Sequence, residues 1–326
     1  MMTSVRAGAS VLTAVREARA IRSAILPVVA LIVLLLLVGI SVSDRFGTAR
    51  NLLNVYEQST GLALVSLGQT MVILTGGIDL SVGSMISLLS ELTSGSINGD
   101  AALVLPVLLA VIALGIVIGM VNGACIVLLR VHPLIVTLGT GAALQGLTLL
   151  YSSHPPGKVP DGFDEIAYGR IFGIPVGASV AVILTLMTAW FLRFLPFGRY
   201  VFAVGADDGA ARLMGLPRHA VIVFVYAFCG FCCALTAIFL VARFGVGQPY
   251  AGYNFTLGSI TPVVIGGTLL SGGKGGVVGT LLGVYLIGLL YNVLNYVGIP
   301  TDWQLLVQGI VVIIAVSVYV QKRKVI

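Results

Sequence analysis

The residues of this chain that could perform chemistry are few, and several of them lie inside apolar stretches. Cys229 and Cys232 have the C-x-x-C spacing of metal and redox sites, but no histidine or charged residue lies beside them. Buried apolar thiols are therefore the favoured interpretation, and we expect no metal site. His132 is a lone histidine directly before Pro133, where a turn residue is expected rather than a ligand.

A glycine-rich segment around Lys274 resembles a phosphate-binding loop only in part. Such a loop needs a glycine five residues before the glycine that precedes the lysine, and a serine or threonine after the lysine. Thr268 and Gly275 occupy these two positions, so we expect no ATP site and no cofactor in this chain. No strand–turn–helix segment brings a nucleophile next to a base. The sequence therefore predicts no catalytic residue and no enzyme.

Two glycine-rich segments interrupt apolar runs at corresponding places in the chain. The first is Thr75–Ser84, and the glycine pair that begins at Gly266 comes 190 positions after the pair that begins at Gly76. Each glycine weakens a helix by about 1 kcal/mol relative to alanine. Interrupted apolar segments in both halves of a chain are typical of the central path of a transporter, whereas ordinary turns at the membrane edge are the alternative. The residues that we expect at helix breaks along this path are Gly76, Gly77, Asp79, Ser81, Gly83, Asn122, Gly266, Gly267, Ser271 and Gly273.

Asp79 and Glu91 are acidic residues close to the first glycine pair. A carboxylate at the centre of a membrane helix costs about 2.5–3.5 kcal/mol, so an acid here needs a reason. Asp79 stands before an apolar run, where its carboxylate can accept the free backbone N–H groups of a helix start. This capping role is the simplest expectation, and a direct role in the transport path is the alternative. Glu91 lies later in the same run and is expected to face a cavity or the outer interface.

The composition excludes a soluble domain. Hydrophobic residues make up 58% of the 326 residues, and charged residues only 9%. Apolar runs of about 20 residues can cross roughly 30 Å of hydrocarbon, and in lipid they must be helical. We therefore predict an all-α polytopic membrane protein with about ten transmembrane helices and glycine-rich helix breaks. The expected spans are residues 24–43, 58–76, 80–98, 103–129, 134–151, 174–195, 219–242, 256–271, 277–297 and 304–320.

The fourth of these spans carries a further packing signal. Gly115, Gly119 and Gly123 are spaced four residues apart. This spacing places the three glycines on one face of a helix, where another helix can approach closely.

The basic residues predict the orientation of the spans. With residues 1–23 in the cytosol, thirteen of the 18 lysine and arginine residues fall on the cytosolic side. We therefore expect cytosolic tails at 1–23 and 322–326, around a membrane domain at 24–321. The charged residues behind the formal net charge of +6 lie between the spans, where they serve this orientation, so no nucleic-acid partner is expected. The basic residues expected outside are Arg45, Arg50, Lys158, Arg170 and Arg243.

The loop at residues 196–218 is predicted to lie in the cytosol and to carry a short helix. Asp207 or Asp208 can cap its start, Gly215 can adopt the left-handed conformation that ends a helix, and Pro217 prevents continuation. Because so short a helix is not stable by itself, docking in a groove of a partner is favoured over rest on anionic lipid headgroups. Alanines at 210 and 211 are expected to keep the docking face slim. We call this docking contact the coupling contact, because it would couple the loop to its partner. The residues assigned to it are Gly205, Ala210, Ala211, Arg212, Leu213, Met214 and Gly215.

Taken together and in order, these motifs resemble the permease subunits of bacterial ATP-binding-cassette importers for ribose and related monosaccharides. The resemblance covers roughly residues 50–320. It rests on segments 76–84, 121–123, 133–139, 198–205, 210–215, 266–268 and 271–275. It implies a bacterial inner-membrane location, a second permease chain, cytosolic ATP-binding subunits and a periplasmic sugar-binding protein. One departure is that such permeases often carry a glutamate and an aspartate where this chain has Thr256 and Gly258.

Two other classes of function remain as alternatives. A permease for branched-chain amino acids or nucleosides would share the superfamily, and its binding protein would set the substrate. A passive facilitator for small polar solutes would not require the cytosolic loop at 196–218. The spans also lack the several intramembrane acids that proton or sodium coupling usually needs, so the energy is expected to come from a partner.

Overall fold

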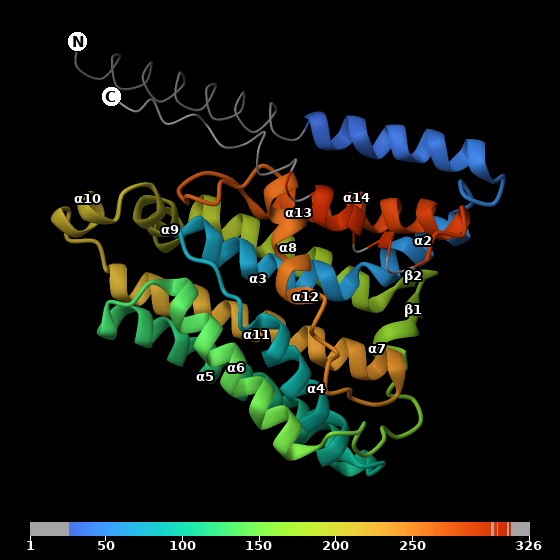
Figure 1. Ribbon diagram of the computed structural model, residues 1–326, viewed down its shortest axis with the longest axis horizontal. Helices are drawn as coiled ribbons and strands as arrows, with labels where there is room; N and C mark the ends of the chain where they lie inside the picture. Colours follow the sequence, from blue (N-terminus) through green and yellow to red (C-terminus); the bar gives the residue numbers. More distant parts are fainter. Residues whose placement is uncertain (1–25, 301–302, 305, 312, 314–326) are drawn as a thin grey trace.

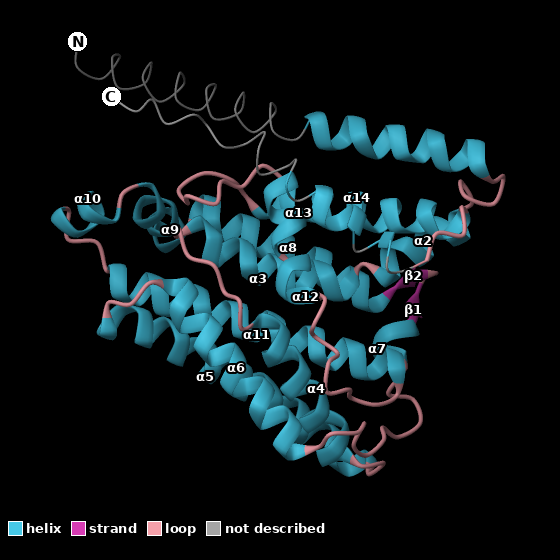
Figure 2. Ribbon diagram, viewed as in Figure 1, coloured by secondary structure: helices cyan, strands magenta, loops and turns pink. Residues whose placement is uncertain are grey.

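The structure, a computed structural model, describes residues 26–300, 303–304, 306–311 and 313. Within these residues the chain is mostly helical, with one two-residue hairpin, and most helices run along the long axis of the molecule (Figure 1; Figure 2). The longer helices are Leu26–Val42, α3 (Thr60–Leu74), α4 (Val82–Ile97), α5 (Val104–Leu129), α6 (Pro133–Tyr151), α8 (Val176–Phe194), α11 (Arg218–Phe244) and α14 (Val277–Tyr296). The shorter elements are α2 (Ala49–Gln58), η1 (Ala101–Leu103), α7 (Glu165–Tyr168), β1 (Arg170–Ile171), β2 (Ile174–Pro175), α9 (Pro196–Ala206), α10 (Asp208–Leu213), α12 (Phe255–Gly258) and α13 (Ile260–Ile265).

Five helices in the described part of the chain are long and apolar enough to cross a membrane. They are the continuous run Ala101–Leu129, α6, α8, α11 and α14. Three shorter apolar helices accompany them: Leu26–Val42, α3 and the pair α12–α13. The helices expected over 103–129, 134–151, 174–195, 219–242 and 277–297 are therefore confirmed. Most of the helix expected over 304–320, and both tails, lie outside the described residues.

Two expected helices have different limits. The helix expected over 58–76 is preceded by α2, so helical structure begins at Ala49 and is interrupted at Ser59. The helix expected over 256–271 is shorter than predicted. It ends at Ile265, because Gly266 follows as the C-cap and Gly267 adopts a positive φ of 86°. Apolar composition extended this prediction beyond the point at which the backbone stops being helical.

Helix α11 is the centre of the molecule and packs against α3, α4 and α5. Its contact with α5 uses the predicted glycine seam, because a Cβ at Gly115, Gly119 or Gly123 would run into the backbone of Gly230, Tyr226 or Val223. Because these glycines have no side chains, the backbones of the two helices are in direct contact.

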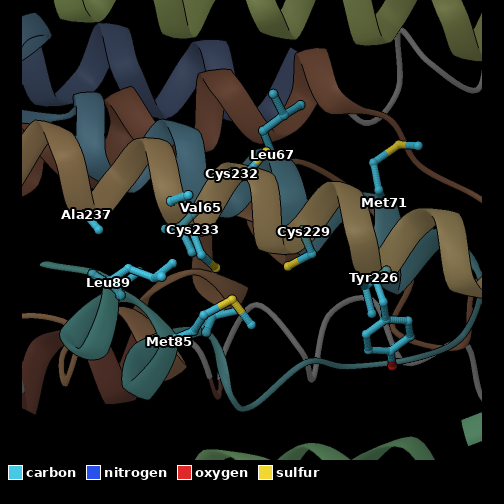
Figure 3. Close-up of a cluster of buried hydrophobic side chains, with 14 of the residues drawn as sticks. Val65, Leu67, Met71, Met85, Leu89, Tyr226, Cys229, Cys232, Cys233 and Ala237 are labelled. Atoms are coloured by element: carbon cyan, nitrogen blue, oxygen red, sulfur yellow. The ribbon is translucent and has the colours of Figure 1, made fainter. Parts of the chain in front are cut away.

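The cysteine pair belongs to the same central core. Cys229, Cys232 and Cys233 are free and buried among Val65, Met85 and other apolar side chains from neighbouring helices (Figure 3). The interpretation of the C-x-x-C pair as buried apolar thiols is therefore confirmed.

The two ends of the molecule carry different elements (Figure 1). One end, which we call the α10 end, carries α9, α10 and the turn Arg130–Pro133. The other, which we call the hairpin end, carries β1, β2 and α7. The side chain of Arg170 in β1 pairs with Glu57 of α2 at 3.3 Å, which ties the hairpin to the helical body.

Helix α4 begins inside the molecule rather than at one of its ends. After α3 ends at Leu74, residues 75–81 return into the interior without helical structure. Ser81 then lies beside Asn122, which is seven residues before the end of α5 at Leu129. At 1.5 Å per residue, α4 therefore starts about 10 Å inside the α10 end.

Helix α12 also begins in the interior, after a segment that returns from the hairpin end. Residues 245–254 run back along α4, where the backbone N–H of Gly247 donates to Ser94 Oγ at 2.9 Å and that of Gly252 donates to Ser87 Oγ at 3.0 Å. A Cβ at Gly83 would overlap Thr256 and lie 2.7 Å from the Gly252 carbonyl oxygen. The starts of α4 and α12 therefore lie next to each other.

Candidate functional site

Helix α10 is a short capped helix at the α10 end. Asp207 Oδ1 accepts a hydrogen bond from the Ala210 backbone N–H at 2.9 Å, and Gly215 has a positive φ of 71°. Arg218 donates to the carboxylate of Asp208, so this arginine already has an acidic partner within the chain. The cap and the stop that the sequence predicted are thus both present, and they hold α10 at a fixed place between α9 and α11.

The two faces of α10 differ sharply. Ala211 is fully buried against the chain's own core, whereas Leu213 is 92% exposed and Met214 is 67% exposed. The slim face expected from the alanines at 210 and 211 is therefore turned, at Ala211, toward the chain itself. The surface open to a partner is formed by the two long apolar side chains.

A backbone junction connects the elements before α10 with both glycine-rich segments. A Cβ at Gly205 in α9 would overlap the Leu74 carbonyl oxygen and lie 2.7 Å from the Gly273 nitrogen. The Gly273 N–H donates to the same Leu74 oxygen at 2.9 Å. A Cβ at Gly272 would lie 2.6 Å from the Gly76 nitrogen. We call Gly76, Gly205, Gly272 and Gly273 the glycine junction.

The junction depends on unusual backbone conformations as well as on small size. Gly76, Gly272 and Gly273 have φ values of 81°, 82° and 73°, a region that favours glycine. From the sequence, Gly205 was assigned to the coupling contact, and Gly76 and Gly273 were assigned to the transport path. The structure brings these residues together at the end of α3.

The second glycine pair follows the end of α13 and contacts α14. Gly266 packs against Gly279 of α14, and the segment that follows closes on itself, since the Leu269 N–H donates to the Lys274 carbonyl at 3.0 Å. Gly272 and Gly273 therefore contact the first glycine segment, whereas Gly266 packs the end of α13 against α14. Ser271 is close by, with its carbonyl oxygen 3.5 Å from a Cβ placed on Gly76.

A cavity of about 1040 Å³ opens at the α10 end, beside the junction. Its walls include Gly76, Gly77 and Tyr226. The charged or ionisable side chains that line it are mostly basic: Arg130, His132, Arg212, Arg218 and His219, with Asp208 as the acid. A cavity of this composition can admit a neutral or anionic group from the α10 end more readily than a cation.

A buried polar cluster lies just after the first glycine pair. Asp79 Oδ1 accepts hydrogen bonds from the Ser81 N–H at 2.9 Å and from Ser81 Oγ at 2.6 Å. Asn122 Nδ2 donates to Ser81 Oγ at 2.9 Å. Asp79 Oδ2 and Asn122 Oδ1 are buried without a hydrogen-bond partner among the described residues. This cluster fixes the start of α4 against α5.

Asp79 does not cap α4 in the way that the sequence suggested. The N-cap residue is Ser81, and no side chain caps this helix start. The Asp79 carboxyl group accepts only the N–H of the N-cap residue itself, because the carboxyl is turned toward the Ser81 hydroxyl.

Glu91 is fully buried, and neither of its carboxylate oxygens has a hydrogen-bond partner among the described residues. Ser87 and Ser94 lie one helical turn to either side of Glu91, and their hydroxyl groups accept hydrogen bonds from the segment 245–254. Glu91 therefore lies on the face of α4 that this segment covers. The expectation of a position at the outer interface does not agree with this burial.

Three contributors to the site were not found from the sequence. Tyr226 lies with its hydroxyl against Gly77, Thr137 Oγ1 accepts from the Leu80 N–H at 3.1 Å, and Gly252 contacts Gly83. Each belongs to a helix or loop far away in the sequence. Only the polar character of Thr137 and Tyr226 within apolar runs gave a signal.

The comparisons with known proteins agree with this architecture. The family of branched-chain amino acid transport system permease components matches residues 51–316. The chain belongs to this permease family. It is 38% identical over 302 residues to the ribose import permease protein RbsC of Escherichia coli K12, which covers 90% of this chain and 93% of that protein.

Two further relatives of the permease are also sugar import permeases that align over most of the chain. The ribose import permease RbsC of Bacillus subtilis is 40% identical over 294 residues, covering 89% of this chain and 90% of that protein. The fructose import permease FrcC of Rhizobium meliloti is 32% identical over 313 residues, covering 93% and 86%. No solved structure gives a match.

Proposed function

We propose that this permease is the membrane subunit of an ATP-binding-cassette importer and forms the path for a monosaccharide, such as a ribose-like pentose or a hexose. A periplasmic binding protein delivers the sugar, and cytosolic subunits bind the ATP. The relatives named for ribose and fructose import align over nearly the whole chain, which supports a sugar as substrate. The loop around Lys274 lacks the phosphate-loop residues, which supports ATP binding on a partner.

The observation that carries this proposal is the exposure of Leu213 and Met214 on α10. Two adjacent large apolar side chains that are exposed on a short, capped helix mark a candidate contact surface. A helix that enters a groove through apolar side chains is a common mode of protein recognition. The partner proposed here is the ATP-binding subunit.

Coupling would pass from α10 to the membrane through the glycine junction. Because Gly205 of α9 contacts the end of α3 and the turn at Gly272–Gly273 directly through backbone atoms, a displacement of α10 and α9 cannot be absorbed by side chains there. Movement of the ATP-binding subunits would therefore shift α3, α4 and α13 together. This rocking would open the path along the residues at the helix breaks.

We place the chain in the bacterial inner membrane with ten spans and both termini in the cytosol. The α10 end is the cytosolic end in this arrangement. The proposed limits are a tail at 1–23, a membrane domain at 24–321 and a tail at 322–326. Two permease chains, identical or different, would assemble around one path.

The proposal is tested by replacing Leu213 with glutamate. Because this side chain is exposed, the permease should insert and fold normally, but a charge would enter the apolar groove of the partner. We expect loss of the ATP-binding subunit in pull-down experiments and loss of sugar uptake in cells.

The matched control is Phe172→Glu at the hairpin end, where the side chain is exposed as well. This variant should keep the ATP-binding subunit, because the hairpin end is the periplasmic end in this arrangement. Retention of the ATP-binding subunit together with normal uptake by Leu213→Glu would refute the coupling role of α10.

A further inference from the structure

A second cavity, of about 290 Å³, lies between α2, α12, α14 and the segment that contains Gln304 and Gln308. Its lining includes six carboxamide side chains and no charged side chain among the described residues. The carboxamides are Gln58, Asn254, Asn292, Asn295, Gln304 and Gln308. We call this cavity the amide pocket.

The amides come from several elements but converge on one place. On α14, Gly288, Tyr291, Asn292 and Asn295 follow the spacing i, i+3, i+4, i+7, so they form one stripe of the helix. The chain after α14 folds back over this stripe. Tyr291 donates to Gln308 Oε1 at 2.7 Å, and Gln304 Nε2 donates to Asn295 Oδ1 at 2.7 Å.

These bonds hold the amides in place without using up their hydrogen-bonding capacity. In Gln308 the oxygen is engaged by Tyr291, whereas no bond to another described residue involves the NH₂ group. In Gln304 the NH₂ group is engaged and the oxygen has no such bond. Among the described residues, the pocket thus presents unbonded donors and unbonded acceptors side by side. A sugar hydroxyl group is itself both a donor and an acceptor, so uncharged amides can supply both of its hydrogen-bond partners.

Space for a ligand is created by a missing side chain. Gly258 of α12 lies in the wall, and a Cβ there would come within 3.3 Å of Gln308 Nε2. Any larger residue would extend toward the free donors of this amide. The rings of Phe255 and Tyr291 supply apolar surface beside the amides, which suits the C–H faces of a sugar ring.

We propose that the amide pocket binds a neutral monosaccharide, with Gln304, Gln308 and Asn295 bonding its hydroxyl groups and Gly258 leaving room for its ring. This inference rests on the proposed function, because it places the sugar of that importer on this chain. Charged solutes are disfavoured, since no described side chain in the pocket offers an opposite charge.

Trp303 provides a reporter, because it is next to Gln304 and is one of two tryptophans in the chain. In the Trp190→Phe variant, Trp303 is the sole tryptophan. The full chain in phosphatidylcholine nanodiscs is titrated with D-ribose, D-fructose and D-allose, and with gluconate as a charged control. We expect a saturable change in Trp303 emission with at least one neutral sugar and none with gluconate.

Two substitutions then test the geometry. Gly258→Leu fills the pocket and Gln308→Leu removes a free donor, so each should weaken sugar binding at least tenfold. Gln145→Leu is the control, because this amide bonds the Pro249 carbonyl outside the pocket and its loss should leave binding unchanged. Normal sugar binding by both pocket variants, or no saturable response to any neutral sugar, would overturn the inference.

Uptake by the assembled transporter separates this inference from the proposed function. If the wild type and both pocket variants take up sugar equally, the importer stands and the amide pocket is not its sugar site. If the wild-type transporter takes up none of the neutral sugars, the proposed substrate class fails. A defect in uptake that is confined to the two pocket variants supports both.

Discussion

The glycine junction makes a sharp prediction for Gly205→Ala. The substitution adds one methyl group where α9 touches the end of α3. The new Cβ would overlap the Leu74 carbonyl oxygen and lie 2.7 Å from the Gly273 nitrogen. Both neighbours are backbone atoms, so no rotamer change can relieve the contact.

Two effects of opposite sign decide the magnitude. Alanine favours a helix over glycine by about 1 kcal/mol. Overpacking a well-filled contact costs about 1–3 kcal/mol. Because the contact is backbone to backbone and α9 must move as a unit, we expect the packing cost to exceed the helix gain. The expected net result is a loss of about 1 kcal/mol of stability, with the turn at Gly272–Gly273 displaced from α3.

The assay has a structural and a functional part. Thermal unfolding of the purified permease should occur a few degrees lower than for the wild type, since about 1 kcal/mol corresponds to roughly 2–4 °C in a chain of moderate size. In the assembled transporter, ATP should still be hydrolysed, because α10 remains exposed and able to dock. Sugar uptake per ATP should fall, because the displaced junction no longer transmits the movement of α9.

The control for Gly205→Ala is Gly146→Ala in α6, where an added Cβ meets no atom within 4 Å. This variant should be as stable as the wild type or more stable, with normal uptake. An unchanged unfolding temperature and unchanged uptake for Gly205→Ala would refute the role assigned to the junction.

Two further predictions concern the buried cluster and the topology. Asp79→Asn should keep normal insertion and uptake, because the new amide oxygen can still accept both hydrogen bonds from Ser81. Asp79→Ala removes the acceptor of both bonds and should lower the unfolding temperature. Equal behaviour of the two variants in thermal unfolding and uptake assays would contradict this account. Single cysteines at Lys158 and Arg212 should label differently in intact cells with a membrane-impermeant maleimide, the first directly and the second only after permeabilisation, and labelling of both from outside would show that the proposed topology is wrong.

Much of the fold followed from local signals in the sequence. Apolar runs located α5, α6, α8, α11 and α14, because a helix that spans a membrane needs a long uninterrupted apolar stretch. The cap at Asp207 and the stop at Gly215 were also predictable, since both are set by residues within one turn of α10. Signals of this kind depend on neighbours in the chain.

Contacts between distant segments were not predictable in the same way. The repeated spacing of the two glycine segments gave no information about their contacts, and in the structure Gly76 lies beside Gly272, six residues after Gly266. Ala211 had the small size expected of a docking face, but size does not reveal which side of a short helix the rest of the chain covers. The amide pocket was also missed, since its amides gather only after the chain folds back over α14.

The adjoining starts of α4 and α12 have an electrostatic consequence. The first turn of a helix carries free N–H groups equivalent to as much as about half of a positive elementary charge. The N-cap residue of neither helix supplies a side-chain hydrogen bond. At the start of α4, however, the buried Asp79 carboxyl group accepts the Ser81 N–H and offsets the partial positive charge of that helix end. The buried acid thus has a structural reason, because it compensates a helix start that lies away from water.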